Sequence, residues 1–497
     1  MSPTRTTLPS QPLASRSLTE VRARAEELGL TLHSSEEELT QRLAVDEATL
    51  ETLRSFDSAA PADADADAGS DDAGSADAGT TAPRWHGRRP TPQPPELETG
   101  RRHGPSWITV SNNPRTVPGD GPLVGWEVGI KDLMAVEAAP LTAGTHAHRT
   151  GLPRRDAVAV HALRAAGATI RGTTNLHALA YGATGISSDW GRPTNPAVPG
   201  AIPGGSSSGS AAAVAEGTAA LTLGTDTSGS IRIPAALCGV VGLKPTRGLV
   251  SLEGCHPLAP TLDHIGPLAR TVDAVALAMS VLAGWGDWHL PEEPEGPVRI
   301  GVLGGYFAQG LGQPVRAAVD RACERLAGAG VELVPVEMPL AEHIPGAQIA
   351  LLGTEAVQSN LVTLRERGAD LPDDVRLRLE AGLARTDEQY AASVTLAERF
   401  RDQVSAALGQ CHALLSPTTA ITATPPEVTH VEVDGGQATV QFSLTRLTMP
   451  FNFSGHPAIT LPLREGTTDP VGLQLVGRTG EDQDLLALSA YVEQILA

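Results

Sequence analysis

The sequence contains few of the residues that stabilise small secreted proteins or that cross membranes. Its 497 residues include four cysteines, none in a CxxC pair, and only 3% aromatic residues. Isolated cysteines in a long chain indicate free thiols in a reducing compartment. No apolar run reaches the length of about 18 residues that a membrane-spanning helix needs. The start, MSPTRTTLPSQPLAS, has no apolar signal-peptide core, so we expect a cytoplasmic location.

Positive charge is also scarce. The chain has 37 Lys and Arg against 57 Asp and Glu, which gives a formal net charge of −20. This balance disfavours binding to a nucleic-acid backbone or to an anionic membrane, so neither is expected as a partner. The hydrophobic fraction of 41% is typical of a globular protein. The composition therefore fits a soluble enzyme.

Two short helices are predicted near the start of the chain. Ser17 and Ser35 are each followed three residues later by a glutamate, a pattern that caps the first turn of helices. The capping boxes predict helices over residues 17–30 and 35–56, and leucines recur at near-helical spacing in the second. We expect residues 1–56 to form a small helical extension.

The composition changes sharply after this extension. Residues 57–77 contain seven aspartates and no basic residue, whereas residues 84–102 are rich in proline and contain five arginines. Neither half has enough apolar surface to offset the loss of chain entropy on folding. Residues 57–105 are therefore predicted to be a disordered linker, acting as a solvated tether or, less simply, as a partner-binding segment.

Residues 106–497 have the pattern of a globular catalytic domain. Short apolar segments such as residues 125–130 and 298–304 alternate with helical segments such as residues 155–166 and 317–329. Such alternation predicts an α/β fold. The last helix is expected over residues 481–496.

Two Gly/Ser-rich loops lie close together in this domain. The first, GGSSSGS at residues 204–210, precedes an Ala-rich helix, and the second, TDTSGS at residues 225–230, follows a strand. A glycine-rich loop before a helix can bind phosphate, but the GK[ST] of a phosphate-binding loop is absent here. The second loop can turn several backbone N–H groups toward one point beside a serine hydroxyl, as an oxyanion hole requires.

A nucleophilic serine also needs a base. The chain has 14 histidines, and none forms an obvious constellation with the loops. A buried lysine with a lowered pKa can serve instead, and Lys131 and Lys244 are the candidates in the domain. Composition and spacing do not choose between these two lysines.

Several longer motifs resemble the amidase signature family. They are GGSSSGSAAAVAEG, LGTDTSGSIRIPAALCGVVGLKPTRG, GWEVGIKD, AGATIRGTTNLHALAYG, TLDHIGPLAR and LTMPFNFSGHPAITLP. The resemblance covers residues 107–497. It implies a large mixed β-sheet flanked by helices, the amidase signature fold, and no metal or organic cofactor.

The resemblance implies a Ser–Ser–Lys catalytic triad. Ser230 is the expected nucleophile, Ser206 the bridging serine held by a cis peptide bond, and Lys131 the base. The implied oxyanion hole consists of the backbone N–H groups of Thr227, Ser228, Gly229 and Ser230. Many members have Gly–Gly where this chain has Ser228–Gly229. The run Ser206–Ser208 also leaves a one-residue slip of the bridging serine open.

Further positions are expected to touch the substrate. The YGATG loop resembles a family loop that approaches the substrate, which gives Gly182, Ala183, Thr184 and Gly185 as candidates, against the alternative of a plain structural turn. Ser207 is expected to hydrogen-bond the proton relay. The partner is a small-molecule amide, and a homodimer is possible within the family.

Four residues have simpler interpretations. Asp226 and Arg232 flank the nucleophile loop and are expected to form a buried ion pair that braces it. Lys244 is expected to pack and form hydrogen bonds, and Cys238 to lie in the core.

The expected activity is hydrolysis of a non-peptide carboxamide C–N bond to an acid plus ammonia or an amine, through a seryl acyl-enzyme. Three alternatives remain at this point. The chain could be the glutamine-hydrolysing component of a tRNA-dependent amidotransferase, the amidase half of an allophanate hydrolase, or a non-catalytic scaffold with the same fold.

Overall fold

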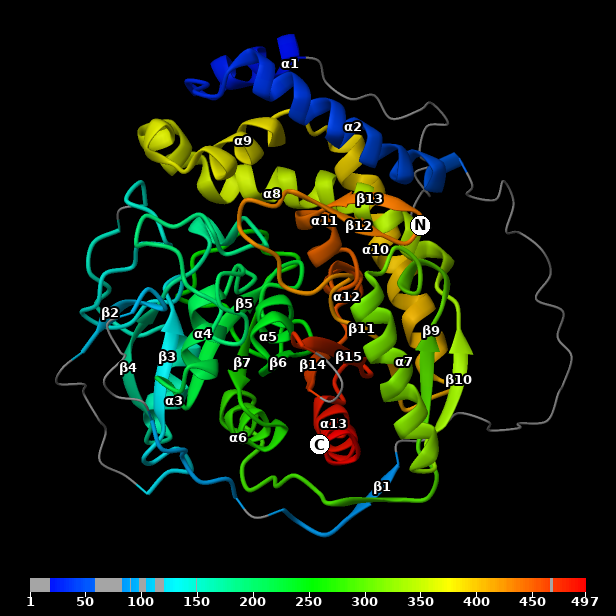
Figure 1. Cartoon of the computed structure of the whole chain (residues 1–497). Coiled ribbons are helices and arrows are strands. Elements are labelled where there is room, and N and C mark those ends of the chain that lie inside the picture. Colours follow the sequence, from blue (N-terminus) through cyan, green and yellow to red (C-terminus); the bar gives the residue numbers. More distant parts are fainter. Residues whose placement is uncertain are drawn as a thin grey trace, which may run out of the picture.

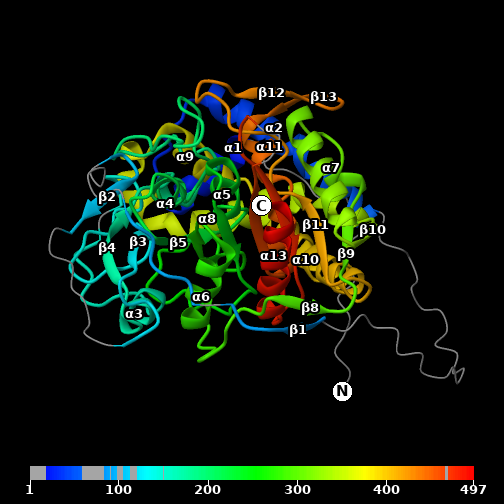
Figure 2. The same ribbon diagram turned by 60° about the horizontal axis from the view of Figure 1, so that its bottom comes forward.

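An eleven-stranded sheet runs through the molecule, and helices cover both of its faces (Figure 1). The computed structural model describes residues 18–58, 83–89, 91–97, 104–111, 120–148, 150–464 and 468–497. The strand order is β10-β9-β11-β15-β14-β6-β7-β5-β3-β4-β2. Figure 2 shows the two edges of this sheet, with β2 and β4 on one side and β9 and β10 on the other. The predicted α/β fold with a large mixed sheet is confirmed.

The sheet is mixed because its outer parts are mainly parallel and its centre is antiparallel. Strand β3 pairs in parallel with β4 and β5, and β9 pairs in parallel with β10 and β11, whereas the other neighbouring strands are antiparallel. The strands of this sheet are β2 (Trp107–Val110), β3 (Glu127–Lys131), β4 (Thr169–Thr174), β5 (Leu221–Asp226), β6 (Val241–Lys244), β7 (His264–Ala269), β9 (Arg299–Leu303), β10 (Glu332–Val336), β11 (Ala413–Pro417), β14 (Ala458–Leu463) and β15 (Val471–Val476).

Successive residues of the sheet strands point into two different apolar cores. In β11, Ala413 and Leu415 belong to one core and Leu414 to the other. Because side chains alternate along a strand, the two cores lie on opposite faces of the sheet. The first core includes α3 (Val158–Ala165), α6 (Val272–Leu282), α7 (Gln313–Gly328) and α13 (Asp482–Leu496). The second includes α8 (Ile344–Arg367), α10 (Asp387–Leu408) and α12 (Met449–Ser454).

The remaining elements are shorter or connect these layers. The remaining α-helices of the catalytic part are α4 (Ser208–Ala215), α5 (Arg232–Cys238), α9 (Asp373–Gly382) and α11 (Val440–Thr445). Among the described residues, the 3-10 helices are η2 (Ala178–Ala180), η3 (Gly305–Phe307), η4 (Pro339–His343) and η5 (Gly368–Asp370). A separate hairpin consists of β12 (His430–Val433) and β13 (Gly436–Thr439). Within the described residues, no helix is both long enough and apolar enough to span a bilayer.

The N-terminal extension forms the two predicted helices, α1 (Leu18–Glu27) and α2 (Glu36–Ser58). Ser35 and Glu38 make the predicted capping box, since the Ser35 N–H donates to Glu38 Oε2 at 2.8 Å and the Glu38 N–H donates to Ser35 Oγ at 3.2 Å. In Figure 1, α2 lies across α8 and α9 at the top of the molecule. Leu50, Leu53 and Phe56 of α2 are buried in the second core. The extension is therefore docked on the catalytic part through apolar contacts.

The segment predicted to be a disordered linker, residues 57–105, is ordered in part. Strand β1 (Arg84–His86) pairs with β8 (Glu293–Glu295) as a small antiparallel sheet. Arg89 then forms an ion pair with Asp273 at the start of α6, with 2.7 Å between Nη1 and Oδ1. The prediction is therefore wrong for this stretch, because backbone pairing and one ion pair fix a sequence with little apolar surface. Residues 59–82, 90 and 98–103 of the predicted linker lie outside the described residues.

Candidate active site

Lys131 and Thr225 meet because their strands are parallel neighbours. Lys131 is the last residue of β3, and Thr225 is the next-to-last residue of β5. The carboxyl ends of adjacent parallel strands lie at the same edge of a sheet, where α/β proteins form their ligand sites. Here Lys131 Nζ lies 2.7 Å from Thr225 Oγ1 and 2.7 Å from Ser206 Oγ. The predicted base is therefore held between two hydroxyl groups.

Lys131 is fully buried, and burial lowers the pKa of its amine to about 7. The negative charges of Asp226 and Asp263 act in the opposite direction and are too weak to restore the usual value. Near neutral pH a substantial fraction of this amine is therefore uncharged and able to accept a proton. The other lysine of the chain, Lys244, is also buried, but its Nζ donates to the carbonyl oxygens of Pro245 and His456 at 3.0 and 2.7 Å. Lys244 thus has the predicted packing role.

The serine run presents different side chains to different partners. The Gly205–Ser206 peptide bond is cis, at the position that the family resemblance implies. Ser206 Oγ faces Lys131, whereas Ser207 Oγ donates to the Thr225 carbonyl oxygen at 3.1 Å. The Ser207 N–H also donates to the carbonyl oxygen of Ser230 at 3.1 Å. Ser207 thus ties the two Gly/Ser-rich loops together, and Ser206 is the serine of the run that contacts the lysine.

Ser230 begins the turn that leads into α5 and lines a cavity, with 7% of its surface exposed. The preceding Gly229 has φ of +120°, and a Cβ there would lie 2.1 Å from Thr448 Oγ1. Both conditions require glycine at this position. The Gly229 N–H donates to Asp226 Oδ1 at 2.8 Å. The prediction of Gly229 as an oxyanion-hole donor therefore conflicts with this structure, because a carboxylate already occupies that N–H.

The other predicted donors are not engaged in this way. In the described part of the chain, the backbone N–H groups of Thr227, Ser228 and Ser230 have no intramolecular acceptor. The side chains around them are fixed: Thr227 Oγ1 donates to Asp263 Oδ1 at 2.5 Å, and Thr448 Oγ1 donates to the Ser228 carbonyl at 2.6 Å. Gln348 Nε2 of α8 donates to Ser228 Oγ. These contacts hold the loop while leaving three N–H groups for an oxygen of a ligand.

Asp226 and Arg232 form the predicted buried ion pair. Arg232 Nε and Nη2 donate to Asp226 Oδ2 and Oδ1 at 3.0 and 2.9 Å, and neither side chain is exposed. Arg232 also donates to the Thr448 carbonyl oxygen at 2.9 Å. Asn452 Nδ2 donates to Asp226 Oδ1 at 2.8 Å. Arg232 and these hydrogen bonds hold the pKa of Asp226 below its usual range despite burial.

A cavity of about 730 Å³ opens beside Ser230. Gly182 and Ala183 of the predicted YGATG loop line it, together with Thr227 and Ser228. Thr184, Gly185 and Ser207 are not among its lining residues. A Cβ on Gly185 would lie 2.6 Å from the Gly204 oxygen, so this glycine packs beneath the serine loop instead. The cavity also has a wall that the sequence did not predict, formed by helix α2 of the N-terminal extension.

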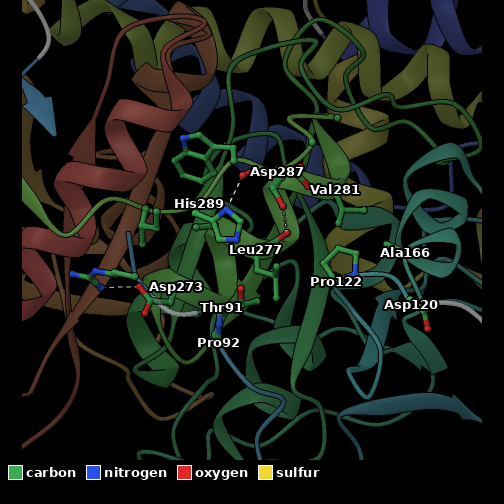
Figure 3. A pocket seen from close by; sticks show the side chains of 17 residues that line it. Thr91, Pro92, Asp120, Pro122, Ala166, Asp273, Leu277, Val281, Asp287 and His289 are labelled. Atoms are coloured by element: carbon green, nitrogen blue, oxygen red, sulfur yellow. Dashed lines mark hydrogen bonds and ion pairs between the residues drawn. The ribbon is translucent and has the colours of Figure 1, made fainter. Parts of the chain in front are cut away.

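A second cavity, of about 610 Å³, lies elsewhere and is shown in Figure 3. Its lining includes Thr91, Asp120, Asp273 and His289, and none of the predicted site residues. Of the predicted site residues, Gly182, Ala183, Thr227, Ser228 and Ser230 instead line the cavity beside Ser230. Within the described ranges, no group of three or more His, Cys, Asp or Glu side chains is arranged to hold a metal ion. Cys238 is buried as predicted, and burial raises the pKa of its thiol.

Comparisons with known proteins identify the family of this chain. The profile of the family described as Amidase matches residues 112–486. Such a match, over most of the chain, places the protein among the hydrolases of carbon–nitrogen bonds in amides. The chain belongs to the amidase signature family.

Individual relatives differ in what they act on. The chain is 37% identical over 371 residues to AtzE, the 1-carboxybiuret hydrolase subunit of Pseudomonas sp. (strain ADP), covering 71% of this chain and 80% of the relative. It is 34% identical over 414 residues to the A subunit of the glutamyl-tRNA(Gln) amidotransferase of Synechococcus sp. (strain RCC307), covering 75% and 84%. A crystal structure of an amidase superposes with a TM-score of 0.72 at 33% identity, covering 97% of this chain and 95% of that one.

Proposed function

We propose that this enzyme hydrolyses a carboxamide C–N bond other than a peptide bond, through an acyl-enzyme on Ser230. The observation that carries the proposal is the position of the Lys131 amine, 2.7 Å from Ser206 Oγ and with a pKa of about 7. This amine lies at the same sheet edge as the loop that presents Ser230 to the cavity. A buried base next to one hydroxyl, at the same sheet edge as a serine that lines a cavity, supports nucleophilic catalysis through Ser230.

The acylation step moves one proton along the triad. Uncharged Lys131 accepts the proton of Ser206, and Ser206 accepts the proton of Ser230. Ser230 Oγ then bonds to the amide carbon, and the carbonyl oxygen becomes an oxyanion. We assign its stabilisation to the free N–H groups of Thr227, Ser228 and Ser230.

Collapse of this tetrahedral species breaks the C–N bond. The leaving nitrogen takes a proton from Ser206, which regains one from the Lys131 ammonium, and ammonia or an amine departs. A water molecule then attacks the acyl carbon with Ser206 and Lys131 acting in the same order. The acid is released, and Ser230 recovers its proton.

A hydrolysis screen on the purified protein tests the proposal. The panel contains small aliphatic amides, aryl amides, amino-acid amides, glutamine and allophanate, with release of ammonia or amine as the readout. We expect activity on at least one member, and its loss in Ser230→Ala with the fold retained by circular dichroism. Activity that survives in Ser230→Ala would overturn the assignment of the nucleophile.

Glutamine hydrolysis within a larger assembly is the second candidate. The observation that favours it is the similarity to the A subunits of several glutamyl-tRNA(Gln) amidotransferases. In that case glutaminase activity would depend on a partner protein and would rise when the partner is added. Efficient hydrolysis of other amides by the isolated chain would contradict this candidate.

A further inference from the structure

The active-site cavity has a charged wall distinct from the reacting serine. Arg42 and Asp46 of α2 and Arg385, from the segment between α9 and α10, all line it. The side chains of Asp46 and Arg385 are each only 2% exposed, whereas that of Arg42 is 30% exposed. Apolar residues line the same cavity, among them Leu258, Ile349 and Leu352. The cavity thus combines a reacting serine, apolar surface and a cluster of buried charges.

This cluster carries more positive than negative charge. Arg42 Nη2 lies 2.9 Å from Asp46 Oδ1, and Arg385 Nη2 donates to Asp46 Oδ2. One carboxylate is therefore shared by two guanidinium groups. The third lining arginine, Arg378, is neutralised separately, because its Nη1 donates to Asp374 Oδ2 at 2.7 Å.

Arg385 also has unused hydrogen-bonding capacity. Its Nη2 has two acceptors, Asp46 and the Ala381 carbonyl oxygen, but in the described part of the chain its Nε and Nη1 have no partner. The whole Arg385 residue is only 7% exposed and its Nε and Nη1 atoms are buried, so water does not readily supply the missing acceptors. Buried N–H groups without an acceptor are costly, and more so on a charged group. A ligand with a carboxylate would provide the negative charge that this cluster lacks, with the partly exposed Arg42 as its accessible donor.

We infer that the substrate amide carries a carboxylate, which binds between Arg42 and Arg385 on the wall supplied by the N-terminal extension. This inference rests on the proposed amide hydrolysis and names the substrate class of the same site. The cavity volume of about 730 Å³ is ample for an amide with a linear chain ending in an acid. Arg42 and Asp46 both belong to α2, so the extension is part of the substrate site.

A matched series of substrates tests the inference. One arm contains monoamides of linear dicarboxylic acids of increasing length, and a second contains N-(carboxyalkyl) amides. Each acid is compared with its methyl ester. We expect the wild type to favour the acid in kcat/KM by about tenfold or more, the gain typical of a charge-assisted hydrogen bond. Added salt is expected to reduce this preference.

Arg42→Gln is the test variant, because Arg42 is partly exposed and Asp46 keeps Arg385 as its partner. We expect its preference for acid over ester to fall about tenfold. Arg42→Lys should recover part of the preference, since it restores the charge without the planar fork. Arg54→Gln is the matched control, because Arg54 lies on the same helix, pairs with Glu51 and does not line the cavity. Its preference should equal that of the wild type.

A binding measurement separates failure of the inference from failure of the proposed function. Calorimetry with Ser230→Ala and a dicarboxylate product, against the matching monoester, reports on the carboxylate site without any turnover. Tighter binding of the dicarboxylate that is lost in the Ser230→Ala/Arg42→Gln double variant supports the inference even if no amide is hydrolysed. Equal binding of both ligands, or an acid preference that Arg42→Gln leaves intact, overturns it. Hydrolysis of neutral amides without an acid preference would overturn the inference alone.

Discussion

The amine of Lys131 lies 2.7 Å from Thr225 Oγ1, in addition to its contact with Ser206. Thr225 is 5% exposed and holds the amine from the side of the neighbouring parallel strand. Two fixed hydroxyl partners restrict the position of Nζ more tightly than a single partner would. In the proposed mechanism, Thr225 is thus a positioning residue that acts through Lys131.

The first prediction concerns this contact. Thr225→Val keeps the shape of the side chain and removes the hydroxyl, so Lys131 loses one hydrogen bond. We expect kcat to fall about tenfold, the rate equivalent of one such bond, with little change in KM. Thr222→Val is the control, because Thr222 is a buried threonine of the same strand whose hydroxyl donates to the Ser210 carbonyl at 3.1 Å. Equal losses of activity in both variants would contradict the positioning role.

The second prediction concerns pH. Only the uncharged amine of Lys131 accepts a proton, and its pKa is about 7. The activity should therefore fall as the pH drops through about 7 and level off above it. The pH profile of kcat/KM measures this limb.

Asp132 is a competing explanation for such a limb, because burial raises the pKa of its carboxyl to about 7 as well. Asp132 Oδ2 accepts hydrogen bonds from the Thr142 N–H, at 2.9 Å, and from the Thr142 hydroxyl. Asp132→Asn is expected to retain the limb near pH 7. Disappearance of the limb in Asp132→Asn would assign the titration to the carboxyl and not to Lys131.

The third prediction separates two adjacent serines. Ser206 Oγ contacts Lys131, whereas Ser207 Oγ contacts the Thr225 backbone. Ser206→Ala should lower kcat by about a thousandfold or more, because it breaks the proton relay. Ser207→Ala should reduce kcat less and should lower the unfolding temperature. Single-turnover kinetics and thermal unfolding of both variants measure these effects, and a larger kcat loss for Ser207→Ala would reverse the assignment.

The fourth prediction concerns the ion pair beneath the nucleophile loop. Arg232→Met leaves Asp226 buried without its partner. We expect the free energy of unfolding to fall by about 3–5 kcal/mol, the usual cost of an unpaired buried charge. Urea denaturation measures this loss. Arg155→Gln removes an exposed pair with Glu253 and should have little effect, so similar losses in both variants would be evidence against the bracing role.

The fifth prediction concerns the docking of α2 on α8. A Cβ on Gly346 of α8 would lie 2.7 Å from Thr52 Oγ1 and 2.8 Å from the Leu53 nitrogen. Gly346→Val should therefore push α2 away and increase hydrogen exchange in residues 36–58. Gly328→Val, at the end of α7 where a Cβ meets nothing within 4 Å, is the control. Unchanged exchange in Gly346→Val would show that this close approach does not determine the docking.

Local features of this protein could be predicted from the order of its residues alone. The capping box at Ser35 predicted the start of α2. The helical spacing of the leucines in α2 predicted which face of this helix is buried. Ser206 and Ser230 were predicted as catalytic serines by family resemblance, on the motifs of the two Gly/Ser-rich loops. Such features depend on neighbours in the chain, whose effects are visible in the amino-acid pattern.

The meeting of distant segments required the folded chain. Thr225 contacts Lys131 because β3 and β5 are adjacent, although they are not consecutive in the chain. Asp46 and Arg385 pair across a separation of 339 residues. Residues 84–86 form a strand because they pair with β8 near residue 294. Their own composition does not indicate this pairing, so the prediction of disorder was wrong there. Strand order and helix docking follow from packing of the whole chain, and local periodicity does not encode them.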